Sequence, residues 1–237
     1  LSERQKLFAA CRGDDSTSLE ALLERPLDPN VTDGLGMTPL HHAVQNYNAT
    51  MVDLLLEANG DTSMATAQGA TPLFTAAQNG DDLLTRKLLE ARADTSRPIA
   101  PASPLSTAAR KGYAKVVRLL IEARADKNQT TTDHGWTPLY LAAQRGHVDV
   151  VRVLIAATAD TSQATTDYGA TPLCIAAQHG HSEVVRALTK AGADTNRALT
   201  NQGATSLTMA AQQGHVEVVR LLIAATADTS HSDRSWG

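Results

Sequence analysis

Short apolar segments alternate with polar segments along most of the chain, and residues 133–162 show the pattern most clearly. Residues 139–143 are mostly apolar and stand between Thr137-Pro138 and Gly146. A threonine hydroxyl can cap free backbone N–H groups, and proline is tolerated at a first helical position because its missing donor would have no partner there. Glycine suits the left-handed conformation that closes a last turn. The segment is therefore predicted to be a short helix that begins at Thr137 and ends at Gly146.

A second apolar segment follows directly. Val150, Val151, Leu154 and Ile155 recur at the spacing that places apolar side chains on one stripe of a helix. This helix is predicted to end at Ala159-Asp160, where a polar stretch begins. Two helices of about ten residues each are marginal in water, because ordering them costs more free energy than so narrow a stripe returns. The pair must therefore bury its stripe against a neighbour.

The same pattern returns at intervals of 32 to 34 residues, each time marked by a Thr-Pro-Leu triplet or a looser copy of it. The copies begin at Thr38, Thr71, Ser103, Thr137, Thr171 and Thr205. Such an interval is typical of stacked supersecondary units. Alanine pairs such as Ala142-Ala143 predict that neighbouring first helices approach each other closely. Function is therefore sought on a surface of the array.

The copies together resemble the ankyrin repeat. They read Thr-Pro-Leu-x-x-Ala-Ala-x-x-Gly-His, followed by a Val-Val-Arg helix and an Ala-Asp exit, and they cover residues 33–228 as six consecutive units. Residues 1–32 look like a seventh, divergent unit that caps the N-terminal end. The resemblance implies an all-α repeat solenoid of about seven stacked helix-turn-helix units with β-hairpin-like fingers. The expected boundaries are 1–32, 33–65, 66–97, 98–131, 132–165, 166–199 and 200–228, with a tail at 229–237.

Composition excludes several classes of protein. A net charge of −4 without a basic run argues against nucleic acid as a principal ligand. No apolar run approaches the roughly 18 residues that a membrane-spanning helix needs. Cys11 and Cys174 stand in distant units, so a disulfide between them is not expected. The absence of an expected disulfide favours a reducing, intracellular setting. The cytoplasm is the expected compartment, or an organelle such as a plastid if a leader was removed before Leu1.

Departures from the repeat predict irregular turns. Tyr47 stands where other copies carry the turn glycine, and Asn46 or Asn48 is expected to take over the left-handed conformation. Only Gly192 supplies a glycine at the exit of a second helix, so the other exits are expected to use a different closing turn or to carry a small strain. Three prolines within residues 97–104 predict a shortened, rigid finger, either drifted or shaped for a partner.

No residue pattern indicates catalysis. His147, His181 and His215 each follow a turn glycine, so a structural role within the repeat is favoured. His179 and His181 lie two residues apart but lack a third ligand, which argues against a metal site. Signature motifs for nucleotides, zinc or nucleophilic catalysis are absent from the sequence. The chain is therefore expected to be no enzyme and to need no metal or cofactor.

The family resemblance implies that a partner contacts the finger tips and the exposed, concave side of the first helices. Aromatic and cationic residues, the types that contribute most to interface energy, concentrate at these positions in the fourth to sixth units. The candidate contact residues are Arg110, Lys111, His134, Trp136, Tyr140, Gln144, Arg145, Tyr168, Gln178 and His179. For the glutamines the alternative is a solvated face, and for Trp136 it is packing on a neighbouring finger. The predicted function is a non-catalytic protein-binding scaffold, and the alternative is a permanent subunit of a large multi-protein complex, for which an organelle is one of the settings considered.

The last unit lacks the polar outer face that terminal repeats normally carry. Its second helix, residues 215–225, nearly matches the internal helix that begins at His147. Val, Leu and Ile side chains are therefore expected to meet water there, unless something covers them. The possible covers are the tail with Trp236, further repeats or a partner subunit, and a partner or further repeats are favoured because the tail is short and polar.

Overall fold

The computed structural model describes residues 2–97, 101–200 and 203–232, with only the backbone described for residues 227–232. Within these residues the chain forms fourteen α-helices and no β-strand. The helices are α1 (Glu3–Arg12), α2 (Ser16–Leu23), α3 (Pro39–Gln45), α4 (Ala49–Glu57), α5 (Pro72–Asn79), α6 (Asp82–Glu90), α7 (Pro104–Lys111), α8 (Ala114–Glu122), α9 (Pro138–Arg145), α10 (Val148–Ala156), α11 (Pro172–Gln178), α12 (Ser182–Lys190), α13 (Ser206–Gln212) and α14 (Val216–Ser232).

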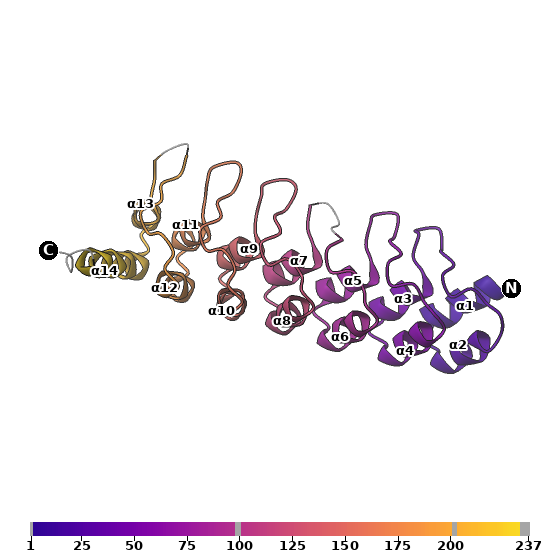
Figure 1. Cartoon of the computed structure of the whole chain (residues 1–237). Coiled ribbons are helices and arrows are strands. Elements are labelled where there is room, and N and C mark those ends of the chain that lie inside the picture. The colour runs from indigo at the N-terminus through magenta and orange to yellow at the C-terminus, as the bar shows by residue number, and fades with distance from the viewer. Residues whose placement is uncertain (1, 98–100, 201–202, 233–237) are drawn as a thin grey trace. The chain divides into compact units, whose positions relative to one another are not determined.

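The chain divides into two compact units. Unit 1 consists of residues 1–108 and 118–125, and unit 2 consists of residues 109–117 and 126–237. In unit 1 the first helices α1, α3 and α5 pack side by side, and the second helices α2, α4 and α6 form a second row (Figure 1). Unit 2 has the same arrangement, with α9, α11 and α13 in one row and α10, α12 and α14 in the other. The predicted helix-turn-helix repeats are therefore confirmed.

The Thr-Pro-Leu triplets begin the first helices as predicted. Thr38, Thr71, Thr137 and Thr171 each accept the backbone N–H three residues later, and proline occupies the first helical position. The alanine pairs of α5, α9 and α11 lie where neighbouring helices pack, and both residues of each pair, such as Ala142 and Ala143, are completely buried. Small side chains at these points allow neighbouring helix backbones to approach closely.

The fingers lead from each second helix to the next first helix and project from the side of the first helices (Figure 1). In unit 2, the Thr131 N–H donates to the Trp136 carbonyl at 2.9 Å, which closes one finger as a hairpin-like loop. Neighbouring fingers are joined as well, because the Thr166 N–H donates to the His134 carbonyl at 3.1 Å. The loops are hairpin-like in closure, but they hold no β-strand within the described residues. The proline-rich finger of residues 97–104 includes residues 98–100, which lie outside the described residues.

The expectation for Tyr47 is wrong. Tyr47 itself adopts the left-handed conformation, with φ of +58°, whereas Asn46 and Asn48 have φ of −85° and −93°. Both asparagines have other roles: the Asn46 side chain donates to the Cys11 carbonyl, and Asn48 caps α4 through the Met51 N–H. Their side chains fix their positions, so the positive φ falls on Tyr47, whose ring is 59% exposed.

Four helix exits carry backbone strain, which was one of the two expected alternatives. Asn59, Arg92, Arg124 and Thr158 have φ of +63°, +60°, +66° and +61° in the place where Gly192 has +81°. The last repeat has no such turn, because α14 continues through Thr226 to Ser232. Residues 229–232, expected to begin the tail, are therefore helical, and Trp236 lies outside the described residues.

Candidate functional site

Histidines join consecutive repeats of unit 2 through the backbone. The Nε2 atoms of His147, His181 and His215 donate to the carbonyls of Arg110, Gln144 and Gln178 at 3.0, 3.1 and 3.0 Å. The rings lie against turn glycines of the preceding repeat: a Cβ added to Gly146 would come within 2.7 Å of His181 Nδ1. The predicted structural role of these histidines is therefore confirmed.

An aromatic stack runs from a finger tip of unit 2 to its first helix. The His134 and Trp136 rings are stacked with centroids 4.6 Å apart, and the Trp136 and Tyr140 rings follow at 5.8 Å. His134 is exposed, Trp136 is half-buried and Tyr140 is only 6% exposed. Burial, together with the charge of Asp167 and the neighbouring Cys174, raises the pKa of the Tyr140 hydroxyl to about 12. Trp136 thus packs within its own repeat while keeping part of its ring accessible.

Two carboxylates flank the His134 end of the stack. Asp167 Oδ2 lies 3.5 Å from His134 Nδ1, and Asp133 Oδ2 lies 3.9 Å from His134 Nε2. Partial burial would raise the pKa of Asp167, but hydrogen bonds from the Thr165 hydroxyl and the Tyr168 N–H outweigh it and hold that pKa below its usual value. The finger tips therefore carry fixed negative charge at neutral pH beside an imidazole.

The Tyr140 end of the stack borders a cavity of about 380 Å³ in unit 2. Its walls come from two fingers and from the first helices α9, α11 and α13. The lining residues are Tyr140, Tyr168, Ala170, Cys174, Ile175, Gln178, Leu199 and Met209. The walls combine apolar side chains with a similar area of polar atoms, and they include Tyr168, which is 56% exposed, and the half-buried Gln178 with its amide. A cavity of this composition suits an apolar side chain that ends in or lies beside a hydrogen-bonding group.

The basic candidates lie at the C-terminal ends of first helices. Arg110 and Lys111 end α7, Arg145 ends α9, and all three side chains are exposed. None of the three has an ion-pair partner within the part of the chain that the structure describes. Cations at these positions interact favourably with the helix dipole and remain available to an external carboxylate.

Gln144 and His179 complete the predicted set. Gln144 is half-buried and uses its carbonyl for His181, which leaves its side-chain amide for other contacts. His179 is exposed, its Nδ1 lies 3.0 Å from the Ile175 carbonyl, and its ring stacks on His181 at 5.9 Å. Burial lowers the pKa of His181, with further lowering from the neighbouring histidines, although the bond to the Gln144 carbonyl opposes this. The pair is a packed contact with its ring nitrogens directed at backbone carbonyls.

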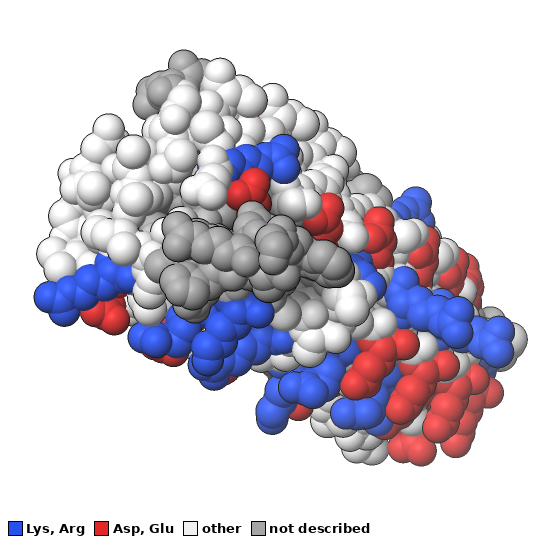
Figure 2. All heavy atoms as spheres, turned by 60° about the vertical axis from the view of Figure 1, so that its left-hand side comes forward, with Lys and Arg blue, Asp and Glu red and all other residues white. Residues whose placement is uncertain are grey.

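Charge is distributed unevenly over unit 2. Its second helices carry pairs such as Arg186–Glu183 at 3.2 Å and Arg186–Glu217 at 3.7 Å. In the left part of Figure 2, Lys, Arg, Asp and Glu gather along the lower side, where these second helices lie, and few occur on the upper side. The upper side in this view therefore carries few charged side chains, and the carboxylates beside the aromatic stack are those of Asp133 and Asp167.

Sequence reasoning selected part of this candidate site and missed part. Trp136, Tyr140 and Tyr168 were selected by residue type. Asp167 and the cavity residues Ile175 and Met209 were missed, because they occupy ordinary repeat positions. The signal that could have found Met209 is its spacing: it lies 34 residues after Ile175, so consecutive first helices place both side chains at equivalent points.

The described residues contain no group of three or more His, Cys, Asp or Glu side chains arranged to hold a metal ion. None of the helices described combines the length and the apolar character that crossing a membrane requires.

Comparison with known proteins identifies the family of this chain. A family model described as ankyrin repeats (3 copies) matches residues 7–99, 88–165 and 159–233. The human ASB11 ankyrin repeat domain is 27% identical over 92% of this chain and 96% of its own, with a TM-score of 0.79. The ankyrin repeat domain of Bcl-3, a member of the IkappaB protein family, is 22% identical over 92% of this chain and 97% of its own, also with a TM-score of 0.79, and supports the fold alone. No curated protein sequence matches the chain. The chain belongs to the ankyrin repeat family.

Proposed function

We propose that this chain is a non-catalytic scaffold that binds a protein partner through the fingers and first helices of unit 2. Ankyrin repeat domains generally mediate protein–protein interaction and are typically non-catalytic. The proposal places the contact at the candidate residues Arg110, Lys111, His134, Trp136, Tyr140, Gln144, Arg145, Tyr168, Gln178 and His179. No cofactor is needed, because binding requires only a preformed surface.

The observation that supports this proposal most is the aromatic stack that ends at a cavity. Trp136 is held between His134 and Tyr140, so little side-chain entropy remains to be lost when a partner covers it. Large aromatic side chains of this kind contribute much of the energy of protein interfaces, because they bury a large area and still offer a polar group.

The surface favours a partner of particular chemistry. An apolar side chain of the partner fits the cavity beside Tyr168 and Gln178. Carboxylates of the partner would pair with Arg110, Lys111 and Arg145, which lack ion-pair partners within the described residues. Rim charges of this kind mainly raise the association rate and set specificity.

The alternative function is a permanent subunit of a large complex. The apolar end face of α14 favours it, since Val216 and Ile223 are 62% and 53% exposed. For either function we propose a reducing intracellular compartment, the cytoplasm or an organelle. Cys11 and Cys174 are buried free thiols, and burial raises the pKa of Cys11 to about 12, which suppresses the reactive thiolate.

The test is to isolate the chain from its source, identify the protein that stays bound, and measure its affinity with purified components. Trp136→Ala combined with Arg145→Ala should weaken binding by about 2 kcal/mol, roughly thirtyfold, because both side chains lie on the proposed surface. The matched control is Met37→Ala with Asn79→Ala, which changes the equivalent repeat positions in unit 1 and should leave the affinity unchanged.

Unchanged affinity in the unit 2 variant, with its circular dichroism intact, would move the site elsewhere. The two functions are distinguished by adding isotope-labelled partner to the complex and measuring how fast it replaces the unlabelled partner that is already bound. A scaffold should exchange its partner within minutes to hours, whereas a permanent subunit should not exchange without unfolding.

A further inference from the structure

The first helix of the last repeat exposes a position that other repeats of unit 2 bury. Ala143 and Ala177 are completely buried in α9 and α11. Ala211, the equivalent residue of α13, is exposed. The difference arises because α11 is packed between α9 and α13, whereas α13 has a first-helix neighbour on one side only within the described residues.

The second helix of the last repeat shows the same contrast. Val151 and Val185 are completely buried in α10 and α12, whereas the equivalent Val219 of α14 is partly exposed. Val216 and Ile223 of α14 are 62% and 53% exposed. The end face of unit 2 thus keeps the apolar residues of an internal repeat.

A ladder of ion pairs along the second helices also stops at this face. Arg152 lies 3.8 Å from Glu183 of the next repeat, and Arg186 lies 3.7 Å from Glu217 of the repeat after that. Arg220 occupies the same helix position in α14 and has no ion-pair partner among the described residues. The register of the ladder therefore predicts a carboxylate, at the position of Glu217, on whatever packs against α14.

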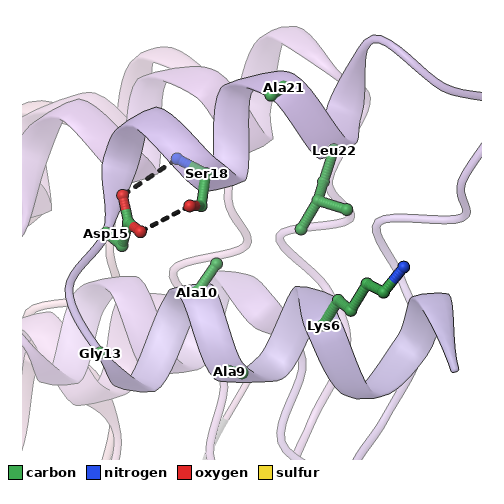
Figure 3. A pocket seen from close by; sticks show the side chains of 8 residues that line it. All are labelled: Lys6, Ala9, Ala10, Gly13, Asp15, Ser18, Ala21 and Leu22. Carbon is green, nitrogen blue, oxygen red and sulfur yellow. Dashed lines mark hydrogen bonds between the residues drawn. The ribbon is translucent and has the colours of Figure 1, made fainter. Parts of the chain in front are cut away.

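The other end of the array differs in chemistry. Figure 3 shows the groove between α1 and α2, where Lys6, Asp15 and Ser18 take part in the lining and Asp15 accepts hydrogen bonds from Ser18. Ser18 stands where internal repeats carry residues such as Val150, which is completely buried, and Lys6 stands at the position of Pro138, which is buried. The N-terminal face is thus a polar cap, whereas the C-terminal face is not.

We propose that the end face formed by Ala211, Val216, Val219, Arg220 and Ile223 docks a helical segment of a protein partner. The segment has an apolar stripe that covers the valine and isoleucine side chains, and a carboxylate that pairs with Arg220. This surface is separate from the finger surface of unit 2, so the inference does not rest on the proposed scaffold function, although it uses the same α14 face that favours the alternative function.

A second copy of this chain is a poorer occupant. Docking its N-terminal groove on this face would bury the Lys6 ammonium against apolar residues, and burial of an unpaired charge is costly. At the position that would meet Arg220, its α2 offers Thr17 rather than a carboxylate.

The probe is a synthetic peptide with the sequence of residues 171–195, whose two helices are held by hydrocarbon staples on exposed positions. In the chain this segment packs against α9 and α10 and presents Glu183 to Arg152. It therefore carries the apolar stripe and the carboxylate that the proposal requires. Binding to the full 237-residue chain is measured by isothermal titration calorimetry, with analytical ultracentrifugation of the chain alone.

The peptide should bind saturably with one site per chain. Arg220→Glu should weaken binding about tenfold or more, because it opposes two carboxylates. A peptide with Glu183→Arg should restore the affinity of that variant. Ile223→Ser should weaken binding of both peptides, and Arg86→Glu, at the same helix position in α6, should have no effect.

Three outcomes would overturn the inference. The first is no binding up to millimolar peptide, and the second is binding that Arg220→Glu and Ile223→Ser leave unchanged. The third is that the chain itself occupies the end face. A second copy would be the occupant if the chain forms concentration-dependent dimers that Ile223→Ser abolishes. The chain's own C-terminal residues would be the occupant if the peptide binds only after residues 233–237 are deleted. Circular dichroism of each variant, matched to the wild type, confirms that loss of binding is not loss of fold.

Discussion

At the scale of single residues, the chain tolerates unfavourable backbone conformations where repeat geometry demands them. Thr158 is the clearest case, because a β-branched residue is strongly disfavoured at positive φ. Gly192, which lies 34 residues later at the same repeat position, has a similar conformation without that penalty. The turn is thus imposed by the packing of the two helices it joins, and the residue adapts to it.

Thr158→Gly is expected to stabilise the chain by about 1 kcal/mol. Relief of left-handed strain, of order 1–3 kcal/mol, exceeds the entropy cost of glycine in the unfolded state. The hydrogen bond from Lys127 to the Thr158 hydroxyl, at 3.1 Å and exposed, adds little. The free energy of unfolding from urea titration checks this.

The reverse substitution is the matched control. Gly192→Thr should destabilise by about 1–3 kcal/mol, and only through its backbone, because a Cβ on Gly192 meets no atom within 4 Å. A Thr158→Gly variant that is no more stable than the wild type would show that the left-handed turn carries no strain.

At the scale of elements, histidines hold helices to the loops and turns of neighbouring repeats. His41 is the most buried example: its Nε2 donates to the Ala70 carbonyl of the next finger at 2.8 Å, and its Nδ1 accepts the Thr38 N–H at 3.1 Å. Both ring nitrogens are satisfied only in the neutral Nε2–H tautomer. Burial lowers the pKa of His41 below its usual value, against the opposing effect of the Ala70 carbonyl.

This predicts that stability falls as the pH is lowered from about 7 to about 5. The unfolded histidine, with a pKa of about 6.5, binds a proton before the folded one does, so protons favour the unfolded state in this interval. Urea titrations at several pH values should show this slope. His41→Gln, which keeps a donor for the Ala70 carbonyl, should reduce the slope, and adding His181→Gln should reduce it further. An identical slope in these variants would contradict the assignment.

Much of the structure of the helices and turns could be predicted from the sequence. The Thr-Pro-Leu triplets, the alanine pairs and the turn glycines act within one or two turns of helix, so residue type alone determines their structure. Tyr47 could not be placed in this way, because its conformation depends on the hydrogen bond from Asn46 to the Cys11 carbonyl, which belongs to another repeat. The extension of α14 to Ser232 likewise departs from the repeat pattern.

At the scale of the whole molecule, function depends on which positions of a regular array carry unusual side chains. The sequence was sufficient to select Trp136, Tyr140 and Tyr168, because aromatic residues are the types that contribute most to interface energy. It did not predict that Tyr140 is buried, or that a cavity lies beside it, since both result from side chains of successive repeats meeting in space. The assignment of these residues to partner binding stays a prediction.

The most direct measurement of the central claim is hydroxyl-radical footprinting of the chain with and without its co-purified partner, read by mass spectrometry. Trp136 is half-buried and Tyr168 is 56% exposed in the free chain, so both should be oxidised readily and should become protected when the partner binds. Tyr47, which is 59% exposed in unit 1, is the internal control and should be oxidised equally in both states. Protection of Tyr47 with Trp136 and Tyr168 unprotected would contradict the account.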